Sequence, residues 1–68
     1  MFIINEYQTN NGATAIVTPV TKANQNEAES VFHQKLSAAA VSRVEIHAVT
    51  LETDEGELVM KGCYKHES

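Results

Sequence analysis

Five residues in the second half of the chain combine positive charge with aromatic rings. They are Arg43, Lys61, Tyr64, Lys65 and His66. Arginine and lysine pair with phosphate oxygens, and an aromatic ring offers a flat apolar face to a base. We predict these residues as candidate contacts for a nucleotide-sized anion, held at one end of the molecule where two copies meet. The alternative is an ordinary strand end whose cations balance nearby glutamates.

Three histidines and one cysteine are the other residues whose types suit chemistry, namely His33, His47, His66 and Cys63. Imidazole and thiolate bind zinc, but the chain has no Cys-x-x-Cys and no pair of histidines one helical turn apart. A Cys63 nucleophile with His47 as its base is an alternative for which no third, orienting group is evident. We therefore predict no metal site, no cofactor and no catalytic residue, and expect a protein that is not an enzyme.

Length and composition restrict the class of protein. The chain has 68 residues, of which 43% are hydrophobic and 21% charged, and this predicts a single globular domain, 1–68, rather than disorder. The formal net charge of −4 disfavours binding to a nucleic-acid backbone, and no apolar run is long enough to span a membrane. The lone Cys63 excludes an intrachain disulfide, so we expect a cytoplasmic location.

The first third of the chain predicts a β-hairpin, Phe2 to Thr21. Asn11-Gly12 supplies two residues that tolerate positive φ, and strand-forming residues lie on both sides. A two-residue turn there places Tyr7 opposite Ile16 and Ile3 opposite Val20, with all four side chains on one face. Apolar residues also occupy the other face. Pro19 lacks an N–H, so the second strand is expected to lie at an edge or to end there.

A helix is predicted from Glu27 to Val41. Asn24 and Asn26 each have a glutamate three residues later, so either asparagine can cap the helix. An amphipathic stripe follows, formed by Ala28, Val31, Phe32, Lys35, Leu36 and Ala39. We expect Phe32 and Leu36 to anchor the helix on a sheet.

The last third predicts a second hairpin, with strands Val44 to Leu51 and Leu58 to Tyr64 around a turn at Asp54-Glu55-Gly56. A three-residue turn implies three cross-strand pairs: Leu51 with Val59, Ile46 with Tyr64, and His47 with Cys63. Apolar parity changes along the first strand, which indicates either burial on both faces or a β-bulge near His47 to Val49. We favour burial on both faces. Gly62 is expected to mark a bulge or a close backbone contact.

These elements predict an α+β fold of the order ββαββ, a four-stranded, mainly antiparallel sheet with one helix packed on one face. One helix covers only one face, whereas both hairpins carry apolar residues on two. The economical cover for the second face is another copy of the chain, so we predict a homodimer or higher oligomer.

Several segments of the chain resemble small uncharacterised proteins of phages and prophages from Gram-positive bacteria. They are Glu27-Ala28-Glu29, Phe32-His33, Leu36, residues 38–42, His47-Ala48-Val49, Glu55-Gly56 and residues 63–66. The resemblance implies a small, non-enzymatic, oligomeric accessory protein in the bacterial cytoplasm, directed at a host component in counter-defence. It assigns no binding residue.

The predicted function is therefore a phage-type binding protein that sequesters a small nucleotide-like ligand between subunits. The alternative is a protein-interaction or structural module that docks a host or phage protein through its exposed sheet face or an edge strand.

Overall fold

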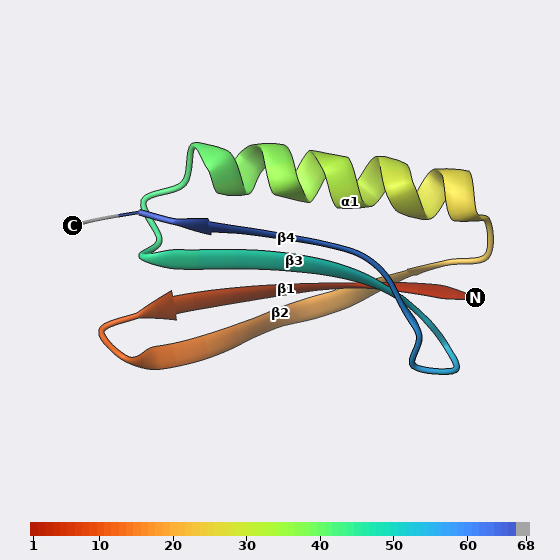
Figure 1. Cartoon of the computed structure of the whole chain (residues 1–68), viewed down its shortest axis with the longest axis horizontal. Coiled ribbons are helices and arrows are strands. Elements are labelled where there is room, and N and C mark those ends of the chain that lie inside the picture. The colour runs from red at the N-terminus through yellow and green to blue at the C-terminus, as the bar shows by residue number, and fades with distance from the viewer. Residues whose placement is uncertain (67–68) are drawn as a thin grey trace.

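The computed structural model describes residues 1–66 as one antiparallel sheet and one helix. In chain order the elements are β1 (Phe2–Asn10), β2 (Ala13–Lys22), α1 (Gln25–Ala40), β3 (Ile46–Thr53) and β4 (Leu58–Lys65). The strand order is β2-β1-β3-β4, which makes β2 and β4 the edges (Figure 1). This confirms the predicted α+β, ββαββ fold.

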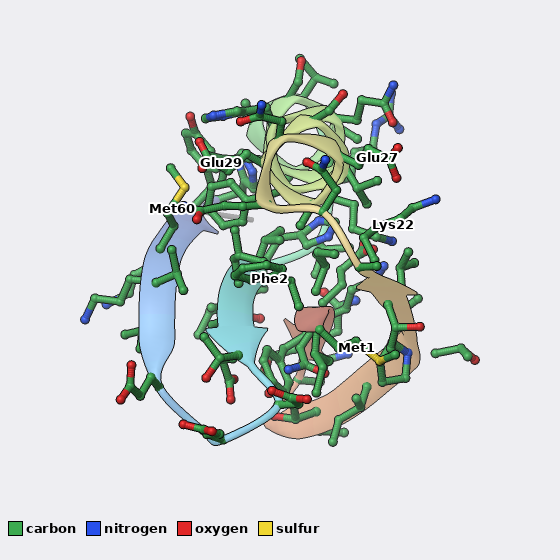
Figure 2. All side chains as sticks on the ribbon, turned by 90° about the vertical axis from the view of Figure 1, so that its right-hand side faces the viewer. Met1, Phe2, Lys22, Glu27, Glu29 and Met60 are labelled. Carbon is green, nitrogen blue, oxygen red and sulfur yellow. The ribbon has the colours of Figure 1, made fainter. Side chains whose placement is uncertain are left out.

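The helix α1 packs on one face of the sheet and leaves the other without cover from the described chain (Figures 1 and 2). Residues Ile4, Ala28, Phe32, Val49 and Leu51 form the buried core between the two layers. Phe32 is 2% exposed, so the predicted anchor is confirmed. Full burial of a side chain of this size stabilises the fold by about 1.5–3 kcal/mol.

Asn24 is the residue that caps α1. Its Oδ1 accepts hydrogen bonds from the backbone N–H of Asn26 at 2.7 Å and of Glu27 at 3.4 Å. The helix therefore begins at Gln25, two residues before the predicted start, and the sequence had left Asn24 and Asn26 equally eligible. The side-chain carboxamide matters because it satisfies amide groups that have no partner within the helix.

The first hairpin turns as predicted at Asn11 and Gly12, whose φ angles are 53° and 79°. Tyr7 pairs with Ile16, but the predicted pair of Ile3 with Val20 is wrong, because Ile3 pairs with Thr21. The pairing shifts between Ile4, which pairs with Val20, and Glu6, which pairs with Val17. Asn5 alone lies between them on β1, whereas two residues including Pro19 lie between their partners, so β2 has one extra residue here. An extra residue of this kind is a β-bulge, and it moves the following side chains to the other face.

A second irregularity displaces the predicted register of β3 and β4. Glu52 pairs with Leu58, but Leu51 pairs with Met60, so Val59 is the extra residue. The three predicted pairs are therefore wrong by one position, and the observed ones are Leu51 with Met60, Ile46 with Lys65, and His47 with Tyr64. No register shift occurs near His47 to Val49, so the bulge alternative for that segment is also excluded.

The shift in β4 places Met60, Gly62 and Tyr64 on the helix side and Lys61, Cys63 and Lys65 on the other side. Met60 packs against the core from the helix side (Figure 2). Gly62 makes the close contact expected of it, because an added Cβ would clash with Leu36 Cδ1. Leu36 thus occupies the space that a side chain at position 62 would need.

Candidate functional site

Of the five predicted ligand contacts, Tyr64, Lys65 and His66 lie at the end of β4, Arg43 lies in the loop before β3, and Lys61 lies in the middle of β4. The contacts on β4 also divide between the two faces of the sheet. Tyr64 and His66 lie on the helix side, where their rings are stacked with centroids 6.2 Å apart and planes 13° apart. His66 Nε2 lies 2.9 Å from the carbonyl oxygen of Ala39, near the C-terminus of α1. This hydrogen bond connects the end of β4 to the helix. The Tyr64 side chain is 39% exposed.

Lys61 and Lys65 lie on the face opposite to Tyr64. Lys61 pairs with Thr50 and Lys65 with Ile46, and both lysines are exposed. Neither lysine forms an ion pair with a carboxylate among residues 1–66. Arg43 is exposed in the loop between α1 and β3. A single ligand on one copy therefore reaches the two lysines without Tyr64 and His66.

The face that α1 leaves uncovered, which we call the open face, carries a row of apolar side chains across all four strands. The register aligns Ile16, Tyr7, Ala48 and Cys63 in that order from β2 to β4. Ile16 is 66% exposed. A solvated antiparallel sheet normally keeps its apolar side chains on the covered face, and this row departs from that pattern.

Cys63 belongs to that row, and this separates it from His47. Cys63 pairs with Ala48 on the open face, whereas His47 is 4% exposed on the helix side. The backbone of β3 lies between the thiol and the imidazole, so the geometry does not support His47 as a base for Cys63. Among residues 1–66, no group of three or more His, Cys, Asp or Glu side chains is arranged to hold a metal ion.

A largely buried polar network beneath α1 is the feature that the sequence did not reveal. Glu6 accepts hydrogen bonds from Lys35 Nζ at 3.0 Å, His47 Nε2 at 2.6 Å and Gln8 Nε2 at 3.2 Å. On its other side, His47 Nδ1 lies 3.1 Å from Ser42 Oγ. Burial works to raise the pKa of Glu6, but the hydrogen bonds of these three partners together with the charge of Lys35 hold it below the ordinary value of 4.5.

Ser42, His47 and Glu6 have the side-chain types of a hydrolytic triad. Their surroundings, however, do not suit Ser42 as a nucleophile. Lys35 pairs with Glu6, and the backbone N–H of Val44 donates to Ser42 Oγ at 3.0 Å. Ser42 also follows the C-terminus of α1, where helix carbonyl dipoles oppose a developing negative charge. We interpret the network as structural, because it joins β1, β3, α1 and the loop after the helix.

Comparisons of the chain with protein-family models, with curated proteins and with solved structures found no match. Across the described residues, α1 is too short and too polar to cross a membrane.

Proposed function

We propose that this protein is a non-catalytic binding protein that works as a homo-oligomer, with the open face as its binding surface. The observation that carries the proposal is the apolar row of Ile16, Tyr7, Ala48 and Cys63 on the face that α1 leaves uncovered. Ile16 and Cys63 are exposed in that row, and Tyr7 and Ala48 are half-buried. Water contact with such a row is unfavourable, and association with a second copy removes it.

The ligand we propose is a small nucleotide-like anion held where copies meet. Lys61 and Lys65 support this, since they stand beside the apolar row and have no carboxylate partner within the described chain. The resemblance to small phage and prophage proteins supports a host molecule as the target, in counter-defence. Sequestration requires no catalytic group, in agreement with the structural character of the Glu6–His47 network.

Light scattering at two protein concentrations, about a hundredfold apart, tests the oligomer. The matched variants are Ile16→Asn and Val41→Asn, which each remove an exposed branched aliphatic side chain; Val41 lies outside the open face and is 83% exposed. We expect self-association in the wild type and in Val41→Asn, and weaker self-association in Ile16→Asn. A wild type that remains monomeric at both concentrations would contradict the proposal.

A thermal-shift series with nucleotides tests the ligand. Binding to the folded state raises Tm, and the increase should be smaller in Lys61→Gln than in Lys22→Gln, which removes a lysine outside β4. If nucleotides leave Tm unchanged while the protein still oligomerises, the proposal of a nucleotide-like ligand is wrong. Docking of a host or phage protein on the open face is then the remaining function, and it requires apolar surface that stays free in the oligomer.

A further inference from the structure

The outer edge of β4 carries main-chain groups that no other strand of the described chain uses. The backbone N–H of His66 donates to the carbonyl oxygen of Glu45 at 2.7 Å, which fixes the alternation of hydrogen bonds between β3 and β4. Along such a pair, every second residue bonds to the neighbouring strand and the residues between point outward. The residues of β4 whose N–H and C=O groups point away from the sheet are Lys61, Cys63 and Lys65. An extended segment of another chain can therefore pair along this stretch.

The opposite edge of the sheet, β2, is less suited to such pairing. Pro19 has no N–H to donate, and the β-bulge beside it interrupts the ladder. Residues 13–21 of β2 also carry no charged side chain, so no charge selects a partner there. In β4, by contrast, pairing with β3 is regular over residues 60–65, and two lysines lie within that stretch.

The charge on the open-face side of the β4 edge is positive. Lys61 and Lys65 are exposed there and form no ion pair with a carboxylate among residues 1–66. Like charges directly opposite one another in a sheet are destabilising, whereas opposite charges stabilise it. The two lysines therefore oppose pairing of β4 with a second β4 and favour a segment that carries carboxylates opposite them.

The helix side of the same edge has a different character. Met60 and Tyr64 point to this side of β4, and Tyr64 is 39% exposed. Glu29 of α1 lies on the same side of the molecule as Met60 (Figure 2). Because Glu29 repels a carboxylate, the residues of an added segment that point to the helix side should be uncharged and apolar.

We infer that β4 pairs along its outer edge with an extended acidic segment of another protein, in which two carboxylates lie four residues apart and apolar side chains point to the opposite face. The spacing follows from Lys61 and Lys65, which are four residues apart on one strand and share a face. Carboxylates with the same spacing lie opposite both lysines, and each outward residue of β4 supplies one main-chain donor and one acceptor.

This interaction goes beyond the proposed function and leaves the open face free for a second copy, because the main-chain hydrogen bonds lie in the plane of the sheet. It shares Lys61 and Lys65 with the nucleotide-like anion. A segment that engages both lysines therefore excludes the anion, and the anion excludes the segment.

Two capped peptides of identical composition test the spacing of the charges. In the matched peptide, Thr-Glu-Val-Thr-Val-Glu-Thr, the glutamates are about one lysine spacing apart and the valines point to the other face. Its pattern reads the same in both directions, so it suits parallel and antiparallel pairing. In the exchanged peptide, Thr-Val-Glu-Thr-Glu-Val-Thr, the glutamates lie closer together and face at most one of the lysines.

Titration of isotope-labelled protein with each peptide, followed by amide NMR, gives both the affinity and the place of binding. We expect the matched peptide to bind about tenfold more tightly at low ionic strength, and this preference to shrink in about 0.5 M salt. The amide signals of Lys61, Cys63 and Lys65 should shift, and those of Thr14 and Ile16 on β2 should not. Equal affinities, or shifts centred on β2, overturn the inference.

Two substitutions of Cys63 test the main-chain pairing. Cys63→Pro removes an outward N–H from the middle of the edge without removing a bond to β3, whereas Cys63→Ala keeps the N–H and removes only the thiol. We expect Cys63→Pro to lose about tenfold in affinity for the matched peptide and Cys63→Ala to bind it like the wild type. Equal affinities of the two variants overturn the edge pairing. If Cys63→Pro fails to fold by circular dichroism, the amide shifts of Cys63→Ala decide, since their absence along β4 has the same consequence.

The double variant Lys61→Gln, Lys65→Gln tests the charges. It should bind the two peptides with equal affinity, and a preference for the matched peptide that persists overturns the role of the lysines. ATP should weaken binding of the matched peptide to the wild type; binding that ATP leaves unchanged overturns the shared use of the lysines. If neither peptide binds while light scattering still shows self-association, the edge interaction is wrong and the proposed oligomer stands, so the two failures are distinguishable.

Discussion

The Glu6→Gln variant tests whether the buried network holds the two layers together. The Glu6 side chain is 13% exposed, and its two carboxylate oxygens accept all three hydrogen bonds from Lys35, His47 and Gln8. A glutamine of the same shape has one acceptor oxygen and an NH₂ group that faces donors. With its oxygen toward Lys35, the glutamine has no acceptor for Gln8 and its NH₂ group can bond to His47 Nε2 only if the imidazole changes tautomer; with its oxygen toward His47 and Gln8, its NH₂ group faces Lys35, which is a donor. In both orientations the bonds to a charged carboxylate are lost.

The expected cost follows from the bonds lost. A hydrogen bond to a charged group contributes about 1.5–3 kcal/mol, and Lys35 recovers part of its loss by reaching water, so we expect the free energy of unfolding to fall by about 2–3 kcal/mol. Chains of this size have a stability of only about 3–5 kcal/mol. The loss corresponds to a decrease in Tm of roughly 8–24 °C.

Urea unfolding followed by far-UV circular dichroism gives the free energies. The matched control is Glu55→Gln, which removes the same charge from an exposed turn and should change stability by less than about 0.5 kcal/mol. If Glu6→Gln is as stable as Glu55→Gln, then the network does not hold α1 on the sheet.

The pH dependence of the free energy of unfolding provides a second test of the network. The folded-state pKa of Glu6 is lower than its unfolded value, so the network's stabilisation is fully present above the unfolded pKa and is lost as pH falls through the folded pKa. The difference in unfolding free energy between wild type and Glu6→Gln should be largest near neutral pH and should shrink on acidification below 4.5. A difference that grows on acidification would show that Glu6 is not stabilised as a carboxylate.

Three further changes test the local structure by the same urea assay. Asn24→Ala should cost about 1 kcal/mol, because it removes the cap, whereas Asn26→Ala should cost less than half of this; equal losses would contradict the observed helix start. Gly62→Ala should cost about 1 kcal/mol, because the new methyl group displaces Leu36, and should cost nothing in a Leu36→Ala background. Deletion of Val59 removes the extra residue without moving Met60 from Leu51, so the chain should still fold cooperatively; an unfolded chain would show that the bulge is required.

Local signals in the sequence predicted the elements well because the chemistry behind them acts over a few residues. Asn11 and Gly12 both adopt the positive φ that the turn requires, and the pair Tyr7 with Ile16 next to that turn was predicted correctly. The helical stripe predicted from Phe32 and Leu36 also matches the packed side. Asn24 was one of two equivalent candidates for the helix cap, since Asn26 is also an asparagine with a glutamate three residues later.

The buried network lay beyond such signals because its members come from distant segments. His47 bonds to Glu6 across 41 positions in the chain, and a sequence pattern does not show which polar residues meet. One clue was present, since His47 shares the strand parity of Val49 and Leu51, both of which are buried. A polar residue at a core parity requires a hydrogen-bonding partner, and Glu6 also points inward from β1, where it lies opposite Val49 and diagonal to His47.

The candidate site was harder to predict than the fold, because a single residue decides which face a strand presents. Had Val59 paired with Leu51, regular alternation would have placed Lys61 and Lys65 beneath the helix and Tyr64 on the open face. Burying two unpaired lysines is far more costly than accommodating one extra residue, so the bulge is the arrangement that the charges of β4 require. The same choice that keeps the lysines in water also groups them with Cys63 on the open face, beside the apolar row.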